Sequence, residues 1–152
     1  MGKPTFECPI PWDKGRTAQT LVIHCSAYDI RPYFTEFVDN HLKLKEYDLL
    51  ALPGGVQILT FAHILPKVRG FFQRIVEFLI KHHDIKKIVI LGHEDCAWYK
   101  DYRFGPIHLD LKSRQLTDLK EVATNLNQVM GVVVEIYFAN IHDGKVTFTK
   151  MD

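Results

Sequence analysis

The sequence lacks the charge excess, the cysteine-rich pattern and the long apolar runs that mark several classes of protein. Lys and Arg together number 19 and Asp and Glu 18, so the formal net charge of +1 leaves no electrostatic footprint for nucleic acid. No stretch approaches the roughly 20 apolar residues that span a bilayer, and residues 1–5 begin no apolar signal core. We therefore expect a cytoplasmic protein that acts on a small molecule or contacts another protein, with no nucleic-acid partner and no membrane.

Cysteine is scarce, with three residues in the chain: Cys8, Cys25 and Cys96. A reducing compartment disfavours disulfides, and an odd number of cysteines there points to metal binding or to free thiols. Cys8 lies in residues 1–16, which are rich in proline, glycine and charge, and we expect a free thiol in an extended lead-in. Cys25 and Cys96 remain as the candidates for chemistry.

Apolar residues make up 47% of the 152 residues, which is enough for a real core, and the length suits one domain over 1–152. Short apolar runs alternate with amphipathic segments along the chain. We expect strands over 20–24, 49–52, 88–91, 132–138 and 145–149. We expect helices over 34–42, 66–79 and 116–129, the second of which begins at a proline.

Continuous apolar strands that alternate with helices imply right-handed crossovers and a sheet covered on both faces. The last two runs are separated by Asp143-Gly144, a strong hairpin signal, so the last strand should be antiparallel. The predicted fold class is α/β, a three-layer α/β/α arrangement with a mostly parallel sheet of about five strands.

The chemistry-bearing residues follow the ends of these strands. Cys25 ends the first run, Gly54 and Gly55 follow the second, and His93 and Cys96 follow the third. Ligands bind beyond the carboxyl ends of strands in open parallel sheets. If the first and third strands are neighbours, Cys25 converges with the His93/Cys96 pair, and the two glycines allow a close backbone approach to that site.

Two thiolates and one imidazole form a donor set that suits zinc. Three protein ligands that leave a fourth position open are typical of catalytic zinc, whereas four are typical of structural zinc. A His-x-x-Cys spacing alone is weak evidence for a metal site. The evidence is stronger here because the spacing occurs at a strand end and a second cysteine stands at the end of another strand. The competing interpretation is that Cys25 and Cys96 are small buried apolar residues.

Four segments resemble the β-class carbonic anhydrases: VIHCSAYDIRP, DLLALPGGV, IKKIVILGHEDCAWY and EIYFANIHDGKVTF. In that family a cysteine ends the first strand and Gly-His-x-x-Cys follows the third. The resemblance implies Zn²⁺ held by Cys25, His93 and Cys96, and a carbonate dehydratase, a lyase that hydrates carbon dioxide to bicarbonate by zinc-hydroxide attack. It also implies a homodimer or a higher homo-oligomer.

The catalytic pair of the family is displaced here. The family pattern is Cys-x-Asp-x-Arg, in which the Asp accepts a hydrogen bond from the reacting water and the Arg holds the Asp. In this chain the corresponding pair, Asp29 and Arg31, comes two residues late. Either the insertion bulges outward and returns Asp29 and Arg31 to the site, or the pair is lost; we favour the first. The family's Arg-Asn-x-Gly-Asn stretch is also replaced, by residues 52–56.

Three alternatives remain open from the residues. The same site could hydrolyse another small electrophile, because pocket shape decides the substrate. The chain could instead be a zinc-stabilised binding or assembly module without catalysis. A Rossmann-like nucleotide binder is the weakest of the three, because Cys25-Ser26 stands where a glycine-rich turn is needed. His24 is expected to be a core histidine, and His108 to lie at the surface or relay protons.

Overall fold

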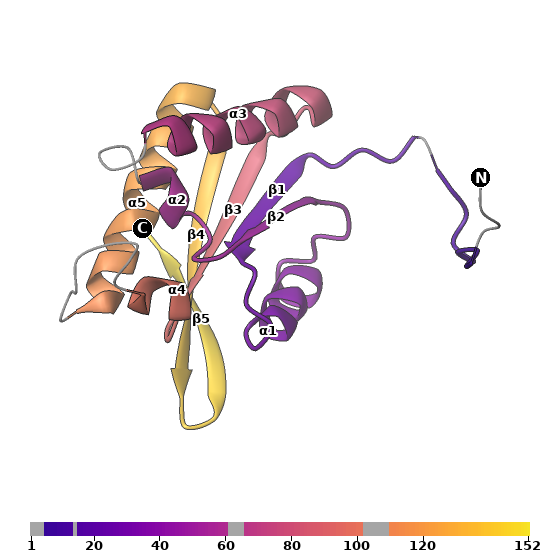
Figure 1. The fold of residues 1–152 in the computed structure, drawn as a ribbon. Coiled ribbons are helices and arrows are strands. Elements are labelled where there is room, and N and C mark those ends of the chain that lie inside the picture. Colours follow the sequence, from indigo (N-terminus) through magenta and orange to yellow (C-terminus); the bar gives the residue numbers. More distant parts are fainter. Residues whose placement is uncertain (1–4, 14, 61–65, 102–109) are drawn as a thin grey trace.

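The chain folds around a single sheet with the strand order β2-β1-β3-β4-β5 (Figure 1). The computed structural model describes residues 5–13, 15–60, 66–101 and 110–152. The strands are β1 (Thr20–Cys25), β2 (Asp48–Leu52), β3 (Lys87–His93), β4 (Val133–His142) and β5 (Lys145–Met151). The helices are α1 (Arg31–Glu36), the π-helix η1 (Phe37–His41), α2 (Gln57–Thr60), α3 (Pro66–His83), α4 (Ala97–Lys100) and α5 (Leu111–Met130).

The strand directions confirm the predicted topology. Strands β1 to β4 pair in parallel, and β5 pairs antiparallel with β4. The hairpin turns at Asp143 and Gly144, whose φ angles of 50° and 71° are the positive values that a tight two-residue turn requires. Because β1 and β3 are neighbours, the expected meeting of their carboxyl ends is realised.

Two apolar clusters lie on the two faces of the sheet and define the predicted three layers. Leu21 and Ile23 of β1 pack into one cluster together with side chains of α2, α3 and α5. Val22, between them in sequence, packs into the other cluster with α1 and η1. Every residue of β1 is buried, as expected for a strand covered on both faces.

The helix boundaries differ in part from the predicted ones. The segment predicted as one helix over 34–42 is α1 followed by the π-helix η1. The last helix begins earlier than predicted, at Leu111, because the Asp110 side chain caps it by accepting a hydrogen bond of 2.9 Å from the Ser113 N–H. It ends at Gly131, whose φ of 66° is a left-handed cap.

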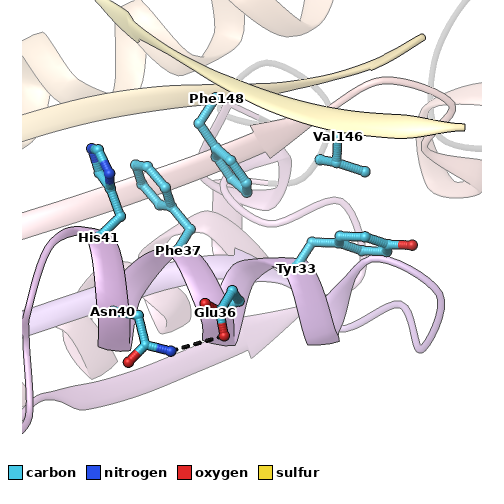
Figure 2. Close-up of a pocket in the computed structure, with 7 residues that line it drawn as sticks. All are labelled: Tyr33, Glu36, Phe37, Asn40, His41, Val146 and Phe148. Atoms are coloured by element: carbon cyan, nitrogen blue, oxygen red, sulfur yellow. Dashed lines mark hydrogen bonds between the residues drawn. The ribbon is translucent and has the colours of Figure 1, made fainter. Parts of the chain in front are cut away.

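A cavity of about 480 Å³ lies between α1, η1 and β5, and Phe37 and Phe148 are among the residues that line it (Figure 2). The two rings stack with centroids 4.0 Å apart, and this contact attaches the last strand to the first helical layer.

Residues 5–13 run outward from the sheet (Figure 1), and Phe6 and Trp12 are exposed there. In the described part of the chain, the helices are all too short or too polar to cross a membrane.

Candidate metal centre

Three predicted ligands meet at the carboxyl end of the sheet. Cys25 is the last residue of β1, His93 is the last of β3, and Cys96 follows in the turn before α4. Their candidate ligand atoms all lie within 4.8 Å of one another, and the two sulfur atoms are 3.9 Å apart. The three residues are only 3–4% exposed. Such a compact, buried group of two thiols and an imidazole matches the donor set of a zinc site.

The His93 ring is oriented by its own neighbour. Its Nδ1–H donates a hydrogen bond of 2.7 Å to the backbone carbonyl of Glu94, which fixes the tautomer and leaves Nε2 as the free lone pair. Nε2 is buried and has no hydrogen-bond partner among the described residues. A buried nitrogen without a partner is costly, and a metal ion would satisfy it.

Backbone amides surround both sulfur atoms. The backbone amides of Ala27 and Gly54 act to lower the pKa of Cys25, and those of Trp98 and Tyr99 act in the same direction on Cys96. A hydrogen bond from the Cys96 thiol, aided by backbone amides, lowers the pKa of Cys25. The same bond, together with burial, raises the pKa of Cys96. Backbone amides are thus in place to stabilise negative charge on sulfur.

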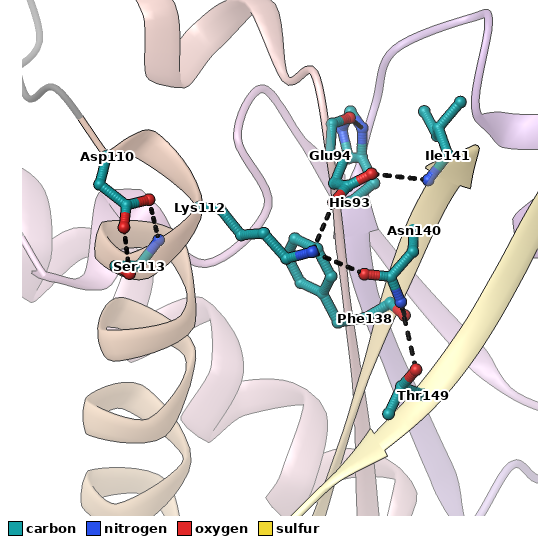
Figure 3. A network of polar contacts seen from close by, with 9 residues as sticks. All are labelled: His93, Glu94, Asp110, Lys112, Ser113, Phe138, Asn140, Ile141 and Thr149. Atoms are coloured by element: carbon teal, nitrogen blue, oxygen red, sulfur yellow. Dashed lines mark hydrogen bonds and ion pairs between the residues drawn. The ribbon is translucent and has the colours of Figure 1, made fainter. Parts of the chain in front are cut away.

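The residue between the ligands is held at three points (Figure 3). The Glu94 N–H donates to the Ala139 carbonyl, and its carboxylate accepts hydrogen bonds from the Ile141 N–H at 2.8 Å and from Lys112 at 2.5 Å. The hydrogen bond from Lys112, followed by that from Ile141, lowers the pKa of Glu94. Asp95, by contrast, is exposed and pairs with Lys100. The structure thus anchors Glu94 to the end of β4.

The displaced pair lies outside the three-residue cluster. Asp29 is exposed, and its Oδ1 accepts a hydrogen bond of 3.0 Å from the Ile30 N–H. Arg31 is also exposed, and its guanidinium lies 5.8 Å from the centre of the exposed Tyr28 ring. The catalytic role of Asp29 and Arg31 therefore stays a prediction.

His24 and the residues around Cys96 complete the surroundings. His24 is buried, donates from Nδ1 to the Cys25 carbonyl at 2.7 Å, and has a pKa lowered chiefly by burial, as expected of a core histidine. Sequence analysis did not find Lys112, because no sequence motif marks it and because it reaches the site only through the packing of α5. It also missed a cavity of about 480 Å³ that Cys96 and Lys112 line. His108 lies outside the described residues.

The turn after β2 packs directly against the site, as its glycines predicted. Gly54 has a φ of 70°, and a Cβ atom there would overlap Cδ1 of Trp98 and lie 2.8 Å from its Cγ.

We expect Gly54→Ala to lower the free energy of unfolding by about 3 kcal/mol, because an alanine would be strained in the left-handed conformation and would overpack against Trp98. Gly131→Ala is the matched control, because Gly131 has a φ of 66° but open space around it. Urea unfolding of both variants measures the difference, and equal losses would show that the Trp98 contact is unimportant.

The sheet is mostly parallel, and two cysteines and a histidine lie at its carboxyl edge. This is the arrangement described above for the β-class carbonic anhydrases. The family model described as "Putative carbonic anhydrase" matches residues 16–148. The chain belongs to the β-carbonic anhydrase family. A comparison with curated proteins finds no significant match.

Solved structures of the family share this fold. The β-carbonic anhydrase isoform I (TvaCA1) of Trichomonas vaginalis is similar with a TM-score of 0.56 and 13% identity, over 91% of this chain and 86% of that chain. The carbonic anhydrase of Streptococcus mutans has a TM-score of 0.54 and 14% identity, over 87% and 81%. The β-carbonic anhydrase CafA of the fungal pathogen Aspergillus fumigatus has a TM-score of 0.52 and 16% identity, over 91% and 77%.

Proposed function

We propose that this protein is a carbonate dehydratase that reversibly hydrates carbon dioxide to bicarbonate with Zn²⁺ held by Cys25, His93 and Cys96. The observation that carries the proposal is the buried, unpartnered Nε2 of His93 beside two buried sulfur atoms. Membership of the carbonic anhydrase family supports the same reaction. The three donors leave a fourth tetrahedral position for chemistry.

The chain's own residues would prepare the site for this reaction. Zinc, when bound, acts as a Lewis acid that lowers the pKa of a water molecule to about 7. Amides from Ala27, Gly54, Trp98 and Tyr99 hold the charge on the two sulfur atoms. Two thiolates supply more negative charge than imidazoles would, so we expect greater activity at alkaline than at neutral pH. Asp29 and Arg31 would orient the reacting water.

We also propose a cytoplasmic homodimer or higher homo-oligomer. The family resemblance supports this assembly, and the exposed Phe6, Ile10 and Trp12 on the outward-running residues 5–13 supply apolar surface for it. The small-molecule partner is carbon dioxide or bicarbonate.

Stopped-flow measurement of carbon dioxide hydration tests the proposal. We expect zinc-loaded protein to hydrate carbon dioxide, and to do so faster at alkaline than at neutral pH. When a chelator removes the metal, the rate should fall by about 100-fold or more. Fully loaded protein that is inactive at both pH values would contradict the proposed reaction while leaving the metal site intact.

The second candidate is a zinc-binding module that does not hydrate carbon dioxide. The exposure of Asp29 and Arg31, outside the three-residue cluster, favours it. Hydrolysis of another small electrophile at the same site belongs with this candidate. Zinc binding without carbon dioxide hydration would support it, and hydration would exclude it.

A further inference from the structure

Lys112, on the first turn of α5, joins that helix to the end of β4 and to the turn between two candidate ligands (Figure 3). Its ammonium group donates to the Glu94 carboxylate at 2.5 Å and to Oδ1 of Asn140 at 2.9 Å, and lies 5.5 Å from the centre of the Phe138 ring. Asn140 is itself held by Thr149 of β5 at 3.1 Å. The ammonium group of Lys112 is thus placed by contacts from the turn after β3 and from β4.

The path from Lys112 to the candidate metal centre is short. Lys112 holds one carboxylate oxygen of Glu94, and the Ile141 N–H holds the other. The backbone carbonyl of the same Glu94 accepts the hydrogen bond from His93 Nδ1. The position of residue 94 therefore sets the direction in which Nε2 of His93 points. Mutating a group that orients a ligating histidine typically lowers metal affinity by about 10- to 100-fold.

We propose that Lys112 is a positioning residue that, through Glu94, holds the His93 imidazole in the orientation needed to bind the metal ion. This inference rests on the proposed zinc site and extends it to a residue on a separate helix. The ammonium touches neither the ion nor the substrate in this role. Without Lys112, the Glu94 carboxylate keeps the contact from the Ile141 N–H, and the backbone keeps the bond to the Ala139 carbonyl. We expect the turn that follows His93 to become less rigid.

The test is the zinc dissociation constant of the full chain, measured by competition with a coloured chelator. We expect Lys112→Met, which keeps the length of the side chain but removes its charge and donors, to weaken zinc binding by about 10- to 100-fold. Lys112→Arg restores charge and donors and should recover most of the affinity. The matched control is Lys120→Met, which removes an exposed lysine two turns along the same helix and should leave the affinity unchanged.

A second readout separates positioning from general loosening of the fold. Long-range ¹H–¹⁵N spectra of the metal-free protein should show His93 as one tautomer in the wild type and in Lys120→Met, and as an exchange-broadened mixture in Lys112→Met. If Lys112→Met does not fold, Glu94→Gln, which keeps an oxygen acceptor but loses the charge, should show the same changes in smaller degree.

The outcomes are distinguishable. Equal zinc affinity in Lys112→Met and Lys120→Met, or an unchanged His93 tautomer, would overturn the role of Lys112 and leave the zinc site standing. A wild-type protein that binds no zinc would overturn both the proposed function and this inference.

Discussion

Replacing Cys25 by serine is expected to reduce zinc from about one ion per chain to almost none, and to abolish carbon dioxide hydration. A serine hydroxyl stays protonated at neutral pH and is a poor zinc ligand, whereas the thiolate is a preferred one. The amides of Ala27 and Gly54, which stabilise negative charge on the sulfur, would then face a neutral group. Elemental analysis after gel filtration measures the loss.

The same substitution should also remove the stabilisation that zinc supplies. Free zinc at 1,000 times its dissociation constant stabilises a binding protein by about 4 kcal/mol, and Cys25→Ser should lose this increment. Thermal unfolding with and without added zinc measures it. Cys8→Ser is the control, since Cys8 is an exposed free thiol. If wild type and Cys25→Ser melt alike and neither carries zinc, the buried cysteines are small core residues instead.

Asp29→Ala is expected to lower carbon dioxide hydration by about 100-fold while leaving zinc content unchanged. The rate should fall because an oriented acceptor for the reacting water contributes rate enhancements of this order. The zinc content should stay the same because Asp29 is outside the ligand cluster. Its carboxylate is exposed and, among the described residues, accepts a local hydrogen bond from the Ile30 N–H, a bond that it could exchange for one from water. Stopped-flow assays at equal zinc loading provide the measurement.

Two companion variants sharpen this prediction. Arg31→Ala should produce a loss of the same kind if Arg31 holds Asp29. Glu36→Gln removes a different carboxylate of the first helical layer, which pairs with Asn40, and should leave the rate unchanged. Hydration at the wild-type rate in Asp29→Ala would show that the two-residue displacement has removed this pair from the reaction.

Much of the fold could be predicted because its determinants are local. Continuous apolar runs and helical spacing located the strands and the longer helices, and Asp143-Gly144 predicted the antiparallel end of the sheet. The convergence of Cys25 with His93 and Cys96 was predicted from the strand ends on the condition that the first and third strands are neighbours, and the β1–β3 pairing meets that condition.

The features that sequence reasoning missed depend on contacts between distant segments or on small energy differences. Lys112 meets Glu94 only after α5 has docked beside β4, and no spacing in the sequence records that contact. The packing of Gly54 on Trp98 likewise joins the turn after β2 to α4, two segments far apart in the sequence. Asp29 and Arg31 are both exposed at the start of α1. Exposed charged pairs are worth only about 0–1 kcal/mol, which is too little for their placement to be predicted from the sequence.

The strand order has a consequence for how the centre assembles. Cys25 and His93 are brought together by the parallel β1–β3 pairing, which can form only after the intervening chain, with β2 and α3, has made its crossover. Such non-local pairing forms late and slowly, because the entropy of loop closure must be overcome first. A zinc ion that needs both ligands would bind only after the sheet has closed. We therefore expect bound zinc to slow unfolding rather than to speed folding.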